Sequence, residues 1–277
     1  VIMSASGPAA TAYAADHTSP DQRTKAMGKL GAAHSTGTIL GPAVSGILAT
    51  LGLLAPLFFA GILTGLAALY IAFKLPATPK DDLVQRKTQT NMKYTDPRVV
   101  RYLAAAIGLF TGFSGVQQTL GFSIQDKMVL SGIETAQMTG AALMVSAIFS
   151  FAAQMLLVQR LNWSPETFIR LGLASLLTST LFIGNFENYF ILNIGMAFMG
   201  TGLGLAMPSI SAAASLAVTA DEQGAIAGLV SSSPAIGFIT GPVIAGLLYQ
   251  INPSYPSVFS AVIFLILLIT LLSTGRR

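Results

Sequence analysis

Residues 37–46 read GTILGPAVSG, and residues 237–246, 200 positions later, read GFITGPVIAG. The two stretches share their glycines and a Gly-Pro pair in register, at Gly37, Gly41, Pro42 and Gly46 in the first copy and at Gly237, Gly241, Pro242 and Gly246 in the second. Asp21 and Asp221, and likewise Gly28 and Gly228, coincide at the same shift. Similarity at one fixed shift indicates an internal repeat, so we expect two related halves.

The composition indicates what kind of protein carries this repeat. Of the 277 residues, 53% are hydrophobic and only 9% are charged, whereas an ordinary soluble domain is about 25% charged. Lipid would solvate the apolar side chains that water cannot. Cysteine is absent, so a disulfide framework and thiolate metal sites are excluded. The composition therefore predicts an all-α polytopic membrane protein.

A spanning helix needs about 20 mostly apolar residues, and such runs give the predicted spans. One partial run covers residues 1–15, and eight complete runs cover residues 27–51, 53–75, 98–122, 134–158, 166–184, 189–219, 222–250 and 255–273. The long polar stretch 76–97 has no apolar periodicity and is predicted to be a connecting loop. It divides the chain into a part at 1–75 and a part at 98–277.

The placement of Lys and Arg tests this helix count, because cytoplasmic loops collect positive charge. If successive predicted helices cross the membrane in opposite directions, all of the fifteen Lys and Arg residues except Lys127 fall on the same side of the membrane. Loop 76–97 and the C-terminus are therefore predicted to be cytoplasmic, in a multi-pass protein of the inner (plasma) membrane. The basic residues line one membrane face and do not form a nucleic-acid surface.

Both copies of the repeat enter the membrane from the predicted cytoplasmic side, with six spans between equivalent points. The repeats are therefore parallel, as in transporters whose halves are related by an axis along the membrane normal. Because the second copy starts near residue 98, the first is expected to start about a hundred residues before Val1. We therefore expect this chain to lack three helices and part of a fourth.

Two segments carry a resemblance to a known family. Residues 15–28, ADHTSPDQRTKAMG, resemble the cytoplasmic link between the fourth and fifth helices of Major Facilitator Superfamily transporters. Residues 37–46 resemble the antiporter motif on helix five of the drug/proton exporters, with Ser45 where a second glycine often stands. The resemblance implies the twelve-helix drug/proton antiporter branch, similar to tetracycline and multidrug exporters. Residues 1–75 would then hold the end of helix four with helices five and six, and residues 98–277 helices seven to twelve.

The physical meaning of the motif is a tight, kinked helix contact. Gly37 and Gly41 lie on one helix face and allow a neighbouring backbone to approach closely, while Pro42 removes a backbone donor and bends the helix. The resemblance implies that this contact lies between the two halves and seals one path during transport. A generic small-residue packing face is the alternative.

A charged pair in the cytoplasmic link is a candidate gate. Asp16 and Arg23 could pair there, or Asp16 could be a helix cap and Arg23 a positive-inside anchor. The second repeat has Asp221 and Glu222 but no Arg at the matching place, so any gate is expected to be asymmetric.

Ionisable residues inside spans are costly and usually functional, and two residues are candidate proton sites. His34 lies on the stripe of Gly37 and is either a coupling residue or a hydrogen-bonded packing residue. Asp126 follows the span 98–122 and is either a proton acceptor at the outer mouth or a solvated loop carboxylate beside Lys127.

Polar, aromatic and Met side chains in the second half mark a candidate substrate cavity. They are Phe113, Gln117, Gln118, Phe151, Gln154, Asn193 and Met196. A buried amide needs a partner, and Met and aromatic groups form an adaptable apolar lining. The set suits a lipophilic, weakly polar small molecule, although hydrogen bonding between helices explains each amide equally well.

The favoured hypothesis is a monomeric secondary transporter that exports drugs or lipophilic metabolites in exchange for protons, by alternating access. An uptake symporter for a nutrient, and a partial chain without transport activity, remain alternatives. No cofactor or metal is expected. An enzyme is not expected either, because the chain has two His, no Cys, no H-E-x-x-H and no carboxylate pair inside a span.

Overall fold

The computed structural model describes residues 37, 41, 44, 45, 47, 48, 51, 52, 54–74, 92–219 and 222–274. The regular elements in this part of the chain are helices: α3 (Ala55–Lys74), α4 (Val100–Met128), α5 (Gly132–Ala153) with its π-helical continuation η3 (Gln154–Val158), α6 (Pro165–Gly184), α7 (Tyr189–Leu216), α8 (Gln223–Ile251) and α9 (Tyr255–Thr274). The predicted all-helical architecture is confirmed. Predicted span 1–15 and most of span 27–51 lie outside the described residues.

Six helices in the described ranges are long and apolar enough to cross a membrane. They are Ala55–Lys74, Gly132–Val158, Pro165–Gly184, Tyr189–Leu216, Gly224–Ile251 and Tyr255–Leu272. Successive helices from α4 to α9 run in opposite directions, so α4, α6 and α8 begin at one end of the bundle. We call this end the Arg98 end and the opposite one the Asp126 end.

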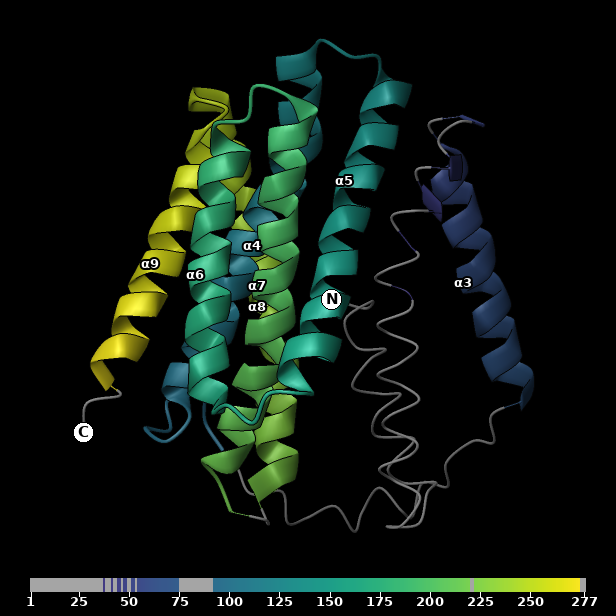
Figure 1. Ribbon diagram of the computed structural model, residues 1–277. Helices are drawn as coiled ribbons and strands as arrows, with labels where there is room; N and C mark the ends of the chain where they lie inside the picture. The colour runs from purple at the N-terminus through teal and green to yellow at the C-terminus, as the bar shows by residue number, and fades with distance from the viewer. Residues whose placement is uncertain are drawn as a thin grey trace.

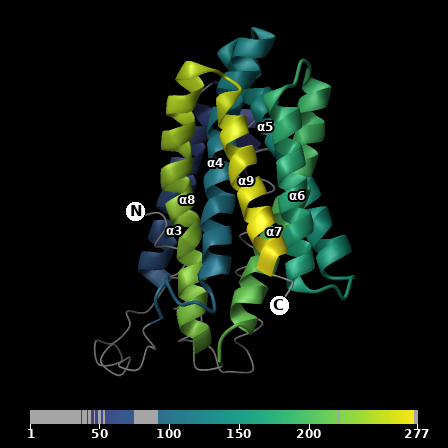
Figure 2. The same ribbon diagram turned by 90° about the vertical axis from the view of Figure 1, so that its left-hand side faces the viewer.

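Helix α4 lies at the centre of the bundle and packs against α5, α7, α8 and α9. Figure 2 shows it between α8 and α9. Its small hydroxyl side chains are buried, namely those of Thr111, Ser114, Thr119 and Ser123. Thr111 and Thr119 donate to carbonyls four residues earlier, at 2.8 and 3.1 Å. Such bonds satisfy a buried hydroxyl within its own helix.

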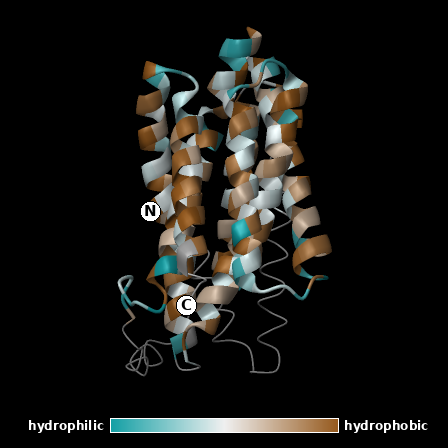
Figure 3. Ribbon diagram, turned by 60° about the vertical axis from the view of Figure 1, so that its left-hand side comes forward, coloured by the Kyte–Doolittle hydropathy of each residue, from teal (hydrophilic) through white to brown (hydrophobic). Residues whose placement is uncertain are grey.

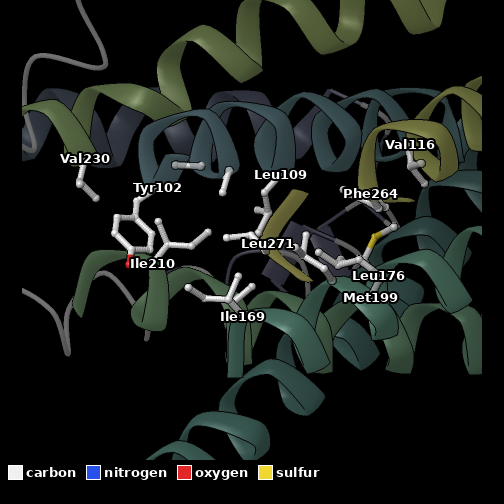
Figure 4. Packing of buried hydrophobic residues seen from close by; sticks show 14 of the residues in the cluster. Tyr102, Leu109, Val116, Ile169, Leu176, Met199, Ile210, Val230, Phe264 and Leu271 are labelled. Carbon is white, nitrogen blue, oxygen red and sulfur yellow. The ribbon is translucent and has the colours of Figure 1, made fainter. Parts of the chain in front are cut away.

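A continuous apolar core joins α4, α6, α7, α8 and α9. Figure 4 shows it from close by, with Leu109, Ile169, Leu176, Met199 and Phe264 pointing toward one another. Each of these five side chains is at most 1% exposed.

The outward faces of the helices are also apolar. In Figure 3 brown residues run along the helices, and most of the teal lies toward the ends of the bundle. Helix α3 stands apart from α4–α9 in Figure 1 and has no buried residue. Its side chains Leu57 and Phe58 are each 69% exposed, as expected for a surface that lipid solvates.

Small residues set the closest helix contacts. A Cβ added to Gly200 would overlap the carbonyl of Ser146, and one added to Gly204 would overlap the carbonyl of Ser150. Helices α5 and α7 run in the same direction, and these two contacts fix their register. This is the close packing through small residues that is typical of membrane helices.

The structure extends α4 to Met128, six residues beyond the predicted span 98–122. Lys127 explains the extension, because its Nζ donates to the carbonyls of Gly184 and Phe186, at 3.0 and 3.3 Å. The same Nζ lies 4.3 Å from the centre of the Phe186 ring. The polar residues 125–127 therefore belong to a helix that is tied to the α6–α7 connection.

Candidate functional site

The second copy of the Gly-Pro motif closes α8 onto α4. A Cβ added to Gly237 would lie 2.5 Å from Phe110 Cβ, and one added to Gly241 would overlap Ser114 Oγ and the carbonyl of Thr111. No such clash occurs at Gly246, where a Cβ would meet nothing within 4 Å. We call the contact of Gly237 and Gly241 with α4 the α4–α8 seam.

Hydrogen bonds and aromatic rings reinforce this seam. Ser114 Oγ donates to the carbonyl of Gly237 at 2.9 Å, and the hydroxyls of Thr111 and Thr240 are 3.1 Å apart. The Phe238 ring lies 5.5 Å from that of Phe110 and 6.3 Å from that of Phe113. Pro242 lies inside α8 directly after Gly241. The motif therefore joins two helices of the same half.

The first copy is described only in part. Gly37 and Gly41 are exposed, and a Cβ added to either would meet no described atom within 4 Å. Pro42 and Gly46 lie outside the described residues, as do Asp16, Arg23 and His34. The predicted contact of the first copy between the two halves therefore stays a prediction.

A cavity of about 550 Å³ lies between α4 and α5 toward the Asp126 end. We call it the α4–α5 cavity. Its polar and aromatic lining comes from Gln118, Phe122 and Gln125 on α4, Thr135 and Thr139 on α5, and Ser45. Gln118, Phe122 and Gln125 share one face of α4 because they are four and three residues apart. The described lining holds amides, hydroxyls and apolar groups but no charged side chain.

A carboxylate borders this cavity. Tyr249 Oη on α8 donates to Asp126 Oδ2 at 2.6 Å. The ring of Tyr249 lies 6.0 Å from that of Phe122, which lines the cavity. Asp126 is thus an exposed residue at the end of α4 that is bonded to a second helix. Its predicted placement in a loop is wrong, and its role as a proton acceptor stays a prediction.

The residues predicted to line the substrate cavity do not come together at one site in the structure. Only Gln118 of that set lines the α4–α5 cavity. Phe113 belongs to the cluster of aromatic rings at the α4–α8 seam. Gln117, the residue before Gln118, is half-buried outside the cavity lining. Met196 is buried in the apolar core. Phe151 is exposed, and Gln154 begins the π-helical segment η3. Asn193 is half-buried, and its Nδ2 donates to the carbonyl of Tyr189 at 2.8 Å.

An ion cluster ties the helices together at the Arg98 end. Arg98 donates to both carboxylate oxygens of Glu222, at 2.9 and 2.8 Å, and to both of Asp96, at 3.1 and 2.8 Å. These bonds, with one from the Thr219 backbone, lower the pKa of Glu222 to about 2. The Arg98 bonds also lower the pKa of Asp96. The second repeat has no Arg beside Glu222 in its sequence, and Arg98 from the segment before α4 takes that place in the structure.

The family profile of the Major Facilitator Superfamily matches residues 1–233 and 162–277. The chain belongs to the Major Facilitator Superfamily. The predicted family is therefore confirmed, and helices α4 to α9 form one bundle of this superfamily member.

Relatives and a solved structure agree with this assignment. Multidrug resistance protein 2 of Bacillus subtilis strain 168 is 28% identical over 274 residues, which is 94% of this chain and 66% of the relative. Tetracycline resistance protein, class C, of Escherichia coli is 26% identical over 91% of this chain and 65% of its own length. The chain thus spans just under two thirds of these relatives.

The crystal structure of the human organic anion transporter MFSD10 superposes with a TM-score of 0.66 at 20% identity. The superposition covers 94% of this chain and 66% of that one. At this identity the likeness concerns the fold alone.

Proposed function

We propose that this superfamily member is a secondary active transporter that exports small lipophilic molecules in exchange for protons. The observation that carries the proposal is the Gly-Pro motif repeated in register, whose second copy forms the α4–α8 seam. Relatives named as multidrug and tetracycline resistance proteins support export of drugs.

The proposed mechanism is alternating access, in which two halves rock about a central path and ligand or proton binding shifts the balance between two states. The seam would keep α4 and α8 together as one rigid part of the moving half. The α4–α5 cavity has Ser45, from the first half, in its lining beside residues of the second half. Its volume would therefore change when the halves rock.

The cavity chemistry supports a lipophilic, weakly polar substrate. Amides and hydroxyls offer hydrogen bonds, and the described lining has no charge that would favour a phosphate or carboxylate. Asp126, bonded to Tyr249 beside the cavity, is the proposed proton site. A carboxylate at such a position gains a proton on one side and releases it on the other as access alternates.

The proposed orientation has the Arg98 end in the cytoplasm and the Asp126 end outside, in the plasma membrane. Among the described basic residues, Lys127 alone lies at the Asp126 end. A strong excess of Lys and Arg on one side is the signature of the cytoplasmic face.

The test uses everted membrane vesicles from cells that express the complete gene, energised with an inward proton gradient. Candidate lipophilic compounds are added while a pH-sensitive dye reports the internal pH. We expect compound-dependent proton release, abolished by Gly241→Leu and by Gly41→Leu, and retained in Gly246→Ala, where the added Cβ meets nothing. Absence of release across a broad panel, with the protein correctly inserted, contradicts the proposal.

A further inference from the structure

Two buried oxygen atoms in the membrane bundle have no hydrogen-bond partner in the described part of the chain. They are Thr139 Oγ1 on α5 and Asn193 Oδ1 on α7. Asn193 already uses its amide nitrogen to bond the carbonyl of Tyr189, which leaves the acceptor end of the amide unpaired. A buried unpaired polar atom is costly, and native structures rarely keep one without a water, an ion or a ligand.

The register of α5 and α7 places these two residues at the same level of one helix contact. Gly200 meets the Ser146 backbone, and Gly204 meets the Ser150 backbone. Two helical turns earlier, seven residues back on each helix, lie Asn193 and Thr139, which therefore share the same contact face. The bond from Tyr189 Oη to the carbonyl of Met138, at 2.7 Å, joins the two helices at this level.

The level of Asn193 and Thr139 is also that of the α4–α5 cavity, because Thr139 lines that cavity. Across from Thr139 stands Gly121 of α4, and a Cβ there would lie 3.6 Å from Thr139 Oγ1. Because Gly121 has no side chain, α4 presents only its backbone to the hydroxyl at this position.

We infer that Thr139 and Asn193 form a hydrogen-bonding subsite for an N–H or O–H group of a ligand held in the α4–α5 cavity. Asn193 Oδ1 only accepts, whereas the Thr139 hydroxyl donates or accepts. The subsite therefore requires a donor on the ligand, and a ligand hydroxyl satisfies both atoms at once. The inference rests on the proposed function for the presence of a ligand, and it narrows the substrate class to lipophilic molecules with an amine, amide or hydroxyl hydrogen.

The test compares two rhodamine esters of equal charge, one with secondary N–H groups and one with both nitrogens fully alkylated. Binding to the purified intact protein is followed by fluorescence anisotropy. We expect the N–H dye to bind about fivefold more tightly, as one buried hydrogen bond provides. Thr139→Val and Asn193→Leu should each bring the ratio close to one without changing the affinity for the alkylated dye.

Two further variants separate the subsite from a packing role. Thr139→Ser keeps the hydroxyl and should keep the preference. Thr178→Val removes a hydroxyl that bonds its own helix at the carbonyl of Ala174, and it should leave both affinities unchanged.

Three outcomes overturn the inference: equal binding of the two dyes, no binding of either, and equal weakening of both in the variants. Equal binding means that the two oxygens hold bound water only. Transport of the same dyes in energised vesicles is measured separately. A binding preference for the N–H dye without proton-driven transport contradicts the proposed function but supports the subsite. Proton-driven transport of both dyes without a binding preference supports the proposed function but contradicts the subsite.

Discussion

At the scale of single residues, Asp126 and Tyr249 meet beside the α4–α5 cavity, with 2.6 Å between Tyr249 Oη and Asp126 Oδ2. If Asp126 carries the transported proton, Asp126→Asn should abolish compound-dependent proton release in energised vesicles while the protein still reaches the membrane. Tyr249→Phe should slow that release, because it removes the hydrogen bond that positions the carboxylate beside the cavity.

Glu187→Gln is the matched control for the Asp126 variant. Glu187 is an exposed carboxylate in the α6–α7 connection at the same end of the bundle. Its loss should leave proton release intact. Release that survives Asp126→Asn at the wild-type level rules out Asp126 as the proton site.

The second residue-scale prediction concerns Arg98. Its bonds lower the pKa of Glu222 from an ordinary 4.5 to about 2. A carboxylate whose pKa is lowered by folding stabilises the fold above its ordinary pKa, and this contribution is lost as the pH falls from 4.5 toward 2. Thermal unfolding in mild detergent should therefore show a steep fall in Tm over this window. Arg98→Gln should lower Tm above pH 4.5 and flatten the fall.

Arg160→Gln is the control, because exposed Arg160 pairs with no carboxylate in the described part of the chain. It should keep the wild-type pH profile. The same steep fall in Arg98→Gln would mean that other carboxylates dominate the acid sensitivity.

At the scale of helices, α4 shows what the sequence could and could not predict. Its existence follows from the apolar run, but its end does not, because Gln125, Asp126 and Lys127 are typical of a loop. The partners that keep these residues helical, Gly184, Phe186 and Tyr249, are distant in sequence. With the longer helix, the spacing of Gln118, Phe122 and Gln125 would have identified the α4 wall of the cavity.

The seam between α4 and α8 carries the prediction at this scale. Gly241→Val should destabilise the bundle by about 1–3 kcal/mol, because its side chain must displace Ser114 and the backbone of α4. The measurement is the shift in Tm of the purified protein in mild detergent. Gly246→Ala, on the same helix, has room for its methyl group and should be neutral or slightly stabilising. Equal effects of the two substitutions would show that the seam is not tightly packed.

At the scale of the whole molecule, the fold could be predicted from two features of the sequence. The apolar composition indicates a protein that lipid solvates, and the internal repeat indicates two related halves. The cavity could be predicted only at Gln118. Its other polar residues, such as Thr135 and Thr139, lie among Ala, Gly and Met on α5. No local sequence pattern distinguishes them from residues that only pack against a neighbouring helix. Which face of α5 meets α4 and which meets α7 is set by tertiary contacts at Gly200 and Gly204, and no single segment encodes that choice.

The orientation of the molecule gives the last prediction, and the absence of cysteine makes it simple to test. Single cysteines are introduced at two exposed connections, Gln159→Cys between η3 and α6 and Glu187→Cys between α6 and α7. Because Lys and Arg gather at the Arg98 end, a membrane-impermeant maleimide should label Glu187→Cys in intact cells and Gln159→Cys only in everted vesicles. The cysteine-free parent should take up no label in either preparation. The reverse pattern would invert the proposed topology and place the Asp126 end in the cytoplasm.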